Sequence, residues 1–526
     1  MSTGATRPKA GRREWIGLAV IALPCVLYSM DLTVLNLALP ALSADLEPSS
    51  SQLLWIVDIY GFLVAGLLIT MGTLGDRIGR RRLLLIGAAA FGVASVLAAF
   101  STSAEMLIAT RAVLGIAGAT LAPSTLSLIR NMFHDPGQRT VAIGVWITSY
   151  SVGAAIGPLL GGVLLQFFWW GSVFLLAVPV MVLLLVLGPL LLPEFRDPEA
   201  GRLDLISAAL SLVGVLTMIY GLKQIAENGP GWLPVMSILA GLAIGVMFVH
   251  RQRKLADPLI DLRLFRRPAF SASLATYMLG TFVGFGIFVF IAQYLQLVLG
   301  LSPLEAGLWT LPWPLAFIVG SMLTPLIVRR VRPPLLMAAG LALAAVGFAV
   351  LTQVDTTSGL GVLVIGSVLY SLGLAPVFTL ATDLIVGAVP PERAGAAAAI
   401  SETSSEFGGA LGIAILGSIG TAVYRGVMAS TVPDGVPPEA TEAARDTLGG
   451  ALAVARRLPD QLGAELLGAA REAFVQALEL AAAISAVLVM TTAVVAVVLL
   501  RRAGAGTEPQ RQPGFLGPIH PAPERS

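Results

Sequence analysis

The chain has 526 residues, of which 56% are hydrophobic and only 12% are charged. Soluble domains carry about 25% charged residues, so a water-soluble protein of this composition could not cover its own surface. A net charge of +2 decides little, a single cysteine (Cys25) excludes a disulfide framework within the chain, and no metal, nucleotide or nucleic-acid site is predicted.

Uncharged stretches such as residues 173–192 and 484–500 recur along the chain. A helix needs about 20 apolar residues to cross ~30 Å of hydrocarbon. We therefore predict an all-α membrane protein with fourteen transmembrane helices. The predicted spans are 15–40, 52–72, 82–101, 105–129, 140–166, 171–192, 204–222, 232–250, 269–299, 303–328, 334–352, 358–388, 394–424 and 475–500.

Basic residues alternate with these spans. The tail 1–14 is basic and has no convincing cleavage site after it, so the first span is interpreted as a retained helix. Most of the 33 basic residues fall on the side that holds both termini. Because basic loops stay inside the cell, both termini are predicted to be cytoplasmic, in a multi-pass plasma-membrane protein. Lys223 is expected beside an outer loop.

An internal repeat divides the chain. Matches lie 253 to 255 positions apart: Ala122-Pro123 with Ala375-Pro376, Gly153 with Gly408, and Gly157 with Gly412. A parallel repeat of six-helix halves leaves two helices over, which gives a 6+2+6 arrangement. The predicted parts are a bundle at 15–192, inserted linker helices at 193–268, a bundle at 269–502 with an extracellular loop at 426–474, and a disordered cytoplasmic tail at 503–526.

Two glycine-rich motifs stand out. Residues 72–82 join the second and third spans, where glycines allow a tight turn and an aspartate can accept from helix N-termini or pair with arginine. They resemble the signature loop of the major facilitator superfamily, which implies a latch on the cytoplasmic side. The fifth span resembles the antiporter signature of drug exporters in that superfamily. Helix packing alone would explain the latter glycines but not their Gly-Pro-x2-Gly-Gly ending, which favours export over uptake. A basic anchor is the alternative for the former arginines. The motif residues are Gly72, Asp76, Arg77, Gly79, Arg80, Gly153, Gly157, Pro158, Gly161 and Gly162.

With residues 31–40, 55–60, 401–409 and Arg111, these motifs resemble the EmrB/QacA-type fourteen-helix drug:proton antiporters. The resemblance implies efflux of lipophilic, often cationic compounds by alternating access, driven by the proton gradient, without cofactor or catalysis, and by a monomer. An uptake symporter for peptides or organic ions is the alternative. A non-transporting receptor or lipid-handling scaffold is the alternative of another class.

Several ionisable residues fall inside predicted spans, where each costs roughly 2.5–3.5 kcal/mol. Glu402 and Glu406 share one helix face, and two repelling carboxylates suit the loading and release of a proton. Asp31 is expected to face the central cavity as a proton or cation site, or else to cap or pair. Arg111 needs a partner, and the resemblance implies a role for it in proton coupling. Asp58 is a candidate for that partner or, alternatively, for a gate residue. Asp383 lies near a cytoplasmic helix end, where solvated capping is equally open.

Aromatic residues in the second half are candidates for stacking on flat cations. They include Trp313, Phe317, Phe285 and Tyr294, and packing or lipid contact is the alternative for each. Some relatives place an acid after the Leu-Pro pair of the tenth span, but residues 311–317 hold none. This departure argues against efficient handling of dications. The pattern of residues 426–474 predicts an extracellular helical hairpin interrupted at Pro459, with a partly ordered surface loop as the alternative. A lid over the exit is the hypothesis for its function.

Overall fold

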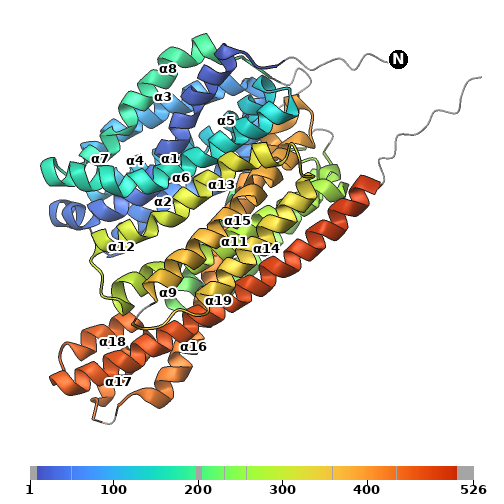
Figure 1. The fold of residues 1–526 in the computed structure, drawn as a ribbon. Coiled ribbons are helices and arrows are strands. Elements are labelled where there is room, and N and C mark those ends of the chain that lie inside the picture. Colours follow the sequence, from blue (N-terminus) through green and yellow to red (C-terminus); the bar gives the residue numbers. More distant parts are fainter. Residues whose placement is uncertain are drawn as a thin grey trace, which may run out of the picture.

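The computed structural model describes residues 9–505, apart from 49, 197–203, 230, 256–257, 358 and 434. Within those residues all regular structure is helical, and fourteen helical segments are long and apolar enough to cross a membrane (Figure 1). The predicted fold class and number of spans are confirmed.

The first six spans form the N-terminal bundle, in which two spans are broken into two helices each. They are α1 (Arg12–Leu46), α2 (Ser50–Ile78), α3 (Arg80–Ala99), α4 (Ala104–Gly118) with α5 (Leu121–Met132), α6 (Pro136–Phe167), and α7 (Ser172–Leu175) with α8 (Ala177–Leu191).

The last six spans form the C-terminal bundle. They are α11 (Pro268–Gln293) with η2 (Tyr294–Val298), α12 (Pro303–Thr310) with α13 (Pro312–Ile327), α14 (Pro333–Leu351), α15 (Leu360–Gly387), α16 (Ala394–Thr431) and α19 (Asp460–Ala505). Two 3-10 turns, η1 (Leu262–Arg266) and η3 (Pro391–Arg393), precede α11 and α16.

The same helix pairs pack in both bundles. In the N-terminal bundle α1 packs on α6 and α3 on α8, as α11 packs on α16 and α14 on α19 in the other. A Cβ on Gly153 would collide with the backbone of α1, and one on Gly408 would collide with the backbone of α11. These matched contacts support the predicted repeat, because each conserves a close approach that needs a residue without a side chain.

The remaining two spans are α9 (Leu205–Asn228) and α10 (Trp232–Gln252), which pack on each other. α9 also contacts α2 of the N-terminal bundle and α16 of the C-terminal bundle. The predicted insert thus lies along the seam between the bundles. The domain boundaries drawn from the sequence remain a prediction that this packing supports.

The segment predicted to form an outer hairpin is helical. It contains the end of α16, α17 (Pro438–Asp446), α18 (Leu448–Ala455) and the beginning of α19, with the break between α18 and α19 at Pro459. The Tyr424 hydroxyl donates to the Ala444 carbonyl over 2.9 Å and ties α17 to α16. Figure 1 shows this lobe projecting from the end of the bundle opposite the N-terminus.

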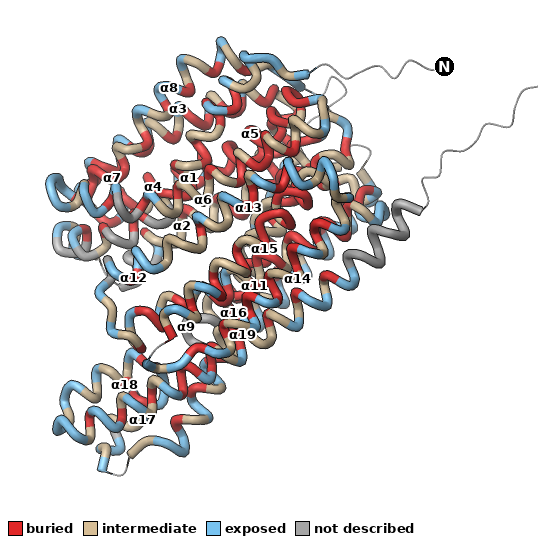
Figure 2. Tube along the Cα trace, viewed as in Figure 1, coloured by how far each residue is buried: buried red, intermediate tan, exposed pale blue. Residues whose placement is uncertain are grey.

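Burial follows the bundles. Buried residues fill the interior of each bundle, while α8 shows many exposed residues (Figure 2). Large apolar side chains such as Val186, Leu190 and Val246 are exposed, as expected where lipid replaces water. Of the tail predicted to begin at residue 503, residues 503–505 end α19, and residues 506–526 lie outside the described part of the chain.

Candidate transport site

The two bundles meet through polar contacts at the end that carries the arginine-rich loops, called here the arginine-rich end. Asp76, near the end of α2, forms an ion pair with Arg80 and accepts from the Ala396 backbone NH of α16 over 3.2 Å. Arg80 is buried and donates to the Glu392 carbonyl over 3.0 Å. Asp76 therefore has both kinds of partner expected for it, an arginine and the N-terminus of a helix, and the motif loop joins the two bundles.

Glycines bring the backbones together at the same place. A Cβ on Gly72 would lie 2.5 Å from the Gly395 carbonyl oxygen and 2.6 Å from the Ala399 Cβ. Gly79 has φ of 112°, which glycine adopts readily, and it makes the sharp turn between α2 and α3. Larger residues at Gly72 would separate α2 from α16.

Asp383 forms a second tie between the bundles. Its carboxylate accepts from Arg139 Nε over 2.5 Å and from the Thr140 hydroxyl over 2.9 Å, which connects α15 to α6. The side chain of Asp383 is 13% exposed. The structure thus places Asp383 with the latch contacts rather than beside Glu402 and Glu406, because the start of α6 packs on the end of α15.

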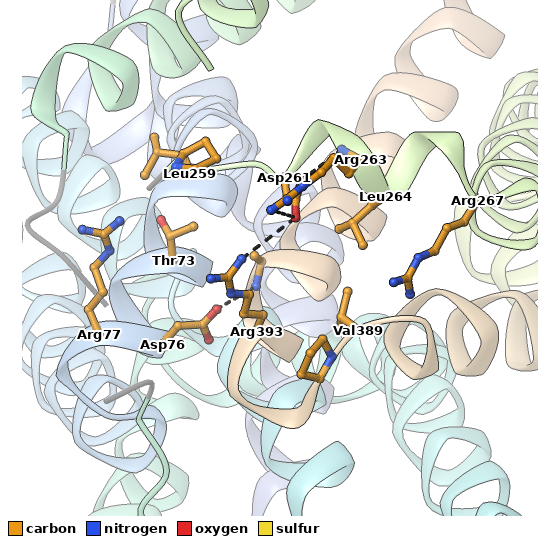
Figure 3. Close-up of a pocket in the computed structure, with 13 residues that line it drawn as sticks. Thr73, Asp76, Arg77, Leu259, Asp261, Arg263, Leu264, Arg267, Val389 and Arg393 are labelled. Atoms are coloured by element: carbon orange, nitrogen blue, oxygen red, sulfur yellow. Dashed lines mark hydrogen bonds and ion pairs between the residues drawn. The ribbon is translucent and has the colours of Figure 1, made fainter. Parts of the chain in front are cut away.

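A pocket of about 350 Å³ adjoins the latch (Figure 3). Arg77 from α2, Asp261 before η1 and Arg393 before α16 line it, and Arg393 lies 4.0 Å from Asp261. Burial opposes ionisation of Asp261, but the bonds from Arg263 outweigh burial and lower the pKa of Asp261. The linker before α11 thereby contacts the latch.

Inside the N-terminal bundle, Arg111 of α4 pairs with Asp31 of α1. The Arg111 Nη1 to Asp31 Oδ2 distance is 2.7 Å, Nε donates to the Ile56 carbonyl over 3.1 Å, and the guanidinium lies 4.8 Å from the Tyr60 ring centroid. The Arg111 side chain is 1% exposed and that of Asp31 is 16%. A buried ion pair needs such supporting contacts to offset its loss of water.

Two expectations for these residues are corrected by the geometry. Asp31 lines a space of about 20 Å³ among α1, α3, α7 and α8, within the N-terminal bundle, and not the larger cavity described below, so the structure fits the alternative that Asp31 pairs. Asp58 is not the partner of Arg111: it forms an ion pair with Lys223 of α9. α1 presents Asp31 to Arg111, while α9 covers the face of α2 that bears Asp58.

Tyrosines connect this ion pair to the other bundle. Tyr60, which contacts Arg111, lies 6.1 Å from the ring of Tyr28, and the Tyr28 hydroxyl donates to Glu406 Oε1 over 3.4 Å. A line of aromatic side chains therefore runs from the Asp31–Arg111 pair to α16. Sequence reasoning did not single out Tyr28, which carries no motif of its own.

Glu406 lines a cavity of about 370 Å³ between α2, α9, α11 and α16. Phe62 and Phe285 form apolar parts of its wall, and Ser405 and Lys223 are among its polar residues. Glu406 lies eleven residues after Gly395, or about 16 Å along the helix. The cavity is thus well separated from the latch, towards the middle of the molecule.

Glu402, one turn earlier on α16, has a different environment. It accepts a long hydrogen bond of 3.5 Å from the Tyr277 hydroxyl of α11. The Tyr277 ring contacts Phe378 at 4.9 Å between centroids, and Phe378 contacts Phe317 at 5.6 Å. No ion pair to an arginine or lysine is recorded for Glu402 or Glu406 among the described residues.

The four predicted substrate aromatics are not brought together. Phe285 lines the cavity with Glu406, and Trp313 contacts Phe288 with ring centroids 5.9 Å apart. Tyr294 is fully buried, and its hydroxyl donates to the Asp355 carbonyl over 2.6 Å. Tyr294 therefore does not lie on the cavity wall, because η2 turns it into the packing at the end of the bundle.

Lys223 is the residue that the sequence interpretation misplaced. α9 continues to Asn228, so Lys223 lies within the helix and reaches the cavity instead of flanking a loop. The signal in the sequence was that Lys223 directly follows a predicted apolar span, which the helix could extend to include. The sequence does not reveal that α9 packs on α2, where Asp58 accepts the ammonium group.

The glycines of the fifth span have two environments. Gly153 packs on α1, and Gly157 and Gly161 are also buried. A Cβ on Gly162, by contrast, would meet nothing within 4 Å. α6 continues to Phe167 through the motif, and the side chain of Pro158 lies outside the described part. The packing interpretation of Gly153 and the antiporter role implied by the motif are compatible.

Comparison with known proteins identifies the family to which this fold belongs. The family model of the Major Facilitator Superfamily matches residues 21–413. The chain is 44% identical over 490 residues to the multidrug efflux pump LfrA of Mycolicibacterium smegmatis, covering 93% of this chain and 97% of that protein. It is 36% identical over 469 residues to the methyl viologen resistance protein SmvA of Salmonella typhimurium, covering 88% and 93%.

A solved structure has the same fold. The human organic anion transporter MFSD10 superposes with a TM-score of 0.57 at 17% identity, covering 90% of this chain and 99% of the other. The fourteen spans, the latch loop and these relatives agree. The chain belongs to the Major Facilitator Superfamily and is a multi-pass efflux transporter of the plasma membrane.

Proposed function

We propose that this protein exchanges protons for lipophilic, often cationic compounds and exports the latter from the cell. The observation that carries the proposal is Glu406, a carboxylate without an arginine or lysine ion pair in the described structure, on the wall of a cavity with phenylalanines. A carboxylate beside aromatic rings attracts a flat cation. The same oxygen atoms bind a proton, so the proton and the substrate compete for one group.

Alternating access requires contacts that close one end and can be broken. The latch at Asp76, Arg80 and Gly395 and the Asp383–Arg139 pair join the bundles at the arginine-rich end. Positively charged loops stay on the cytoplasmic side. We infer that this end faces the cytoplasm and that the structure represents a state closed on that side.

The Asp31–Arg111 pair has a different part in the proposal. It lies inside one bundle, and the Tyr60 and Tyr28 rings connect it to Glu406 in the other. Protonation of Glu406 would weaken its interaction with a cation and favour release. The pair would then hold the N-terminal bundle as a rigid body that rocks on the other. We expect the monomer to suffice, with the proton gradient as the energy source and no cofactor.

Relatives support export as the direction. LfrA is described as a multidrug efflux pump, and a relative in Streptomyces glaucescens, 32% identical over 499 residues, as a tetracenomycin C resistance and export protein. Both names describe export. The lining of the cavity supports the proposed class of substrate for this chain.

Transport by purified protein in proteoliposomes tests the proposal, with ethidium as the probe and an imposed pH gradient. Exchange predicts that ethidium accumulates in vesicles that are acidic inside and not in vesicles that are acidic outside. Glu406→Gln should abolish the pH-driven part, and a protonophore should do the same in the wild type. Accumulation with the opposite gradient would instead indicate an uptake symporter, and no transport in either gradient would indicate a receptor or scaffold.

A further inference from the structure

The inserted helix α9 supplies a charged side chain to the cavity. α9 contacts α2 and α16, one from each bundle, so it lies across the seam. Lys223, near its end, lines the same cavity as Glu406. The chain contains only three lysines, at positions 9, 223 and 254, and of these Lys223 alone lies within a membrane-spanning helix of the described structure. The insert is therefore part of the cavity wall as well as a spacer.

The ammonium group of Lys223 has two partners. It forms an ion pair with Asp58 of α2, and it lies 4.8 Å from the ring centroid of Phe62. The Lys223 side chain is 39% exposed and that of Asp58 is 19%. An alkyl ammonium group on an aromatic face beside a carboxylate is the arrangement that a lipophilic cation would make in this cavity. The ammonium group of Lys223 thus acts as a built-in cation at a site that a cationic ligand could otherwise use.

The charges around the cavity define what it attracts. With both carboxylates ionised, Asp58 and Glu406 carry two negative charges and Lys223 carries one positive charge, which leaves one net negative charge. One negative charge suits one positive charge on the ligand. Asp58 is connected to the cavity by its ion pair with Lys223, which lines the wall together with Glu406. Without the ammonium group, the uncompensated charge of Asp58 would add to that of Glu406 and would favour a ligand with two positive charges.

We propose that Lys223 sets the charge class of the substrate, by holding Asp58 so that the cavity accepts monocations and rejects dications. This inference rests on the proposed export of cations and specifies which cations are taken. Lysine suits the role better than arginine, because its ammonium is a point charge on a flexible stem and does not make the forked bond of a guanidinium to a carboxylate.

A matched pair of dyes tests the proposal. Ethidium and propidium share one phenanthridinium ring, and propidium carries a second fixed positive charge on its side chain. Binding of each dye to the purified full-length protein in nanodiscs is measured by fluorescence titration. The wild type should bind ethidium more tightly than propidium. Lys223→Met should raise the affinity for propidium relative to ethidium by about tenfold or more, the size expected from a charge a few ångströms away at an intermediate dielectric.

Three further variants keep the test independent of any loss of folding. Lys254→Met removes a lysine from the loop after α10 and should leave the dye ratio unchanged. Asp58→Asn with Lys223→Met restores one net negative charge and should restore the preference for ethidium. Asp58→Asn alone leaves no net charge around the cavity. The affinity for ethidium should fall about tenfold relative to the affinity for the neutral dye N-phenylnaphthylamine.

The outcomes separate this inference from the proposed function. A dye ratio that stays the same in Lys223→Met would overturn the inference and leave cation export intact. Failure of the wild type to bind either dye would overturn both. Should Lys223→Met fail to fold, Asp58→Asn decides by itself, since unchanged ethidium binding in that variant would also contradict the charge count.

Discussion

The two bundles treat their intramembrane charges in opposite ways. In the N-terminal bundle, Asp31 and Arg111 neutralise each other, and a backbone carbonyl and an aromatic ring complete the shell of the guanidinium. In the C-terminal bundle, Glu402 and Glu406 accept long hydrogen bonds from tyrosine hydroxyls. The first pair lies in packed protein, and Glu406 lies on a cavity wall.

This difference in pairing suits the buried charges to two different functions. A compensated pair resists a change in protonation, because removal of either charge leaves the other without a partner. A carboxylate with weak partners changes protonation or binds a cation at lower cost. We therefore assign rigidity to the Asp31–Arg111 pair and exchange to Glu406.

The largest effect is expected at the compensated pair. Arg111→Met leaves Asp31 buried without its cation and should lower the free energy of unfolding by about 3–5 kcal/mol. Denaturant titration of the purified protein in mixed micelles measures the change. Asp31→Leu combined with Arg111→Met should be less damaging than Arg111→Met alone. A single variant as stable as the wild type would show that the pair is not compensated in the manner described.

The next effect falls on transport. Glu406→Gln should reduce kcat/KM for ethidium export at least about tenfold, or about 1.4 kcal/mol, while stability changes by less than about 0.5 kcal/mol. Initial rates in proteoliposomes and unfolding in the same detergent give the two quantities. Glu392→Gln, on the arginine-rich end, serves as the matched control and should transport normally, since its contact with Arg80 uses the backbone carbonyl. Loss of stability equal to that of Arg111→Met would erase the contrast between the bundles.

The latch should respond more modestly. Asp383→Asn removes the charge that Arg139 and Thr140 contact across the bundles, at a cost of about 1–2 kcal/mol. Because the contact joins separate bundles, the loss should favour opening of the arginine-rich end. Spin labels at positions 82 and 329, in a Cys25→Ala background, should report longer distances. An unchanged distance distribution would mean that the remaining latch contacts hold that end closed.

The smallest effect concerns the insert. The bonds from Arg251 lower the pKa of Asp204, so its ionised form stabilises the fold above the ordinary aspartate pKa, and this is lost only as pH falls through the lowered value. Asp204→Asn should destabilise the protein by about 1 kcal/mol, by a constant amount between about pH 5 and about pH 8. Unfolding titrations across that range measure it. A stability advantage of the wild type that grows as the pH falls towards about 5 would indicate a raised pKa of Asp204 and would contradict this account.

Much of the fold was predictable because it depends on composition over long stretches. The apolar spans and the loop at residues 72–82 are each recognisable from one short stretch of sequence. The repeat is recognisable from matches between such stretches. The partners of single charges have no such signal, since Asp31, Asp58 and Lys223 are paired by helices far apart in the chain. Asp58 and Arg111 lie in neighbouring spans, yet α1 and α9 supply their partners.

The same reason explains why the surroundings of Tyr294 and Asp383 were not predictable. The inward or outward direction of Tyr294 depends on the π-turn at the end of α11, and that of Asp383 depends on where α6 begins. Periodicity within one helix does not report either. The carboxylates on α16 were identified because their spacing places both on one face, whatever packs against it.

Proton release on substrate binding tests the central assignment most directly. Tetraphenylphosphonium is added to the purified protein in weakly buffered detergent solution, and the change in pH is recorded. The wild type should release protons, Glu406→Gln should release none above background, and Asp31→Asn should still release them if the variant is folded. Release from Glu406→Gln equal to that of the wild type, or release abolished by Asp31→Asn alone, would contradict the division of labour between the two bundles.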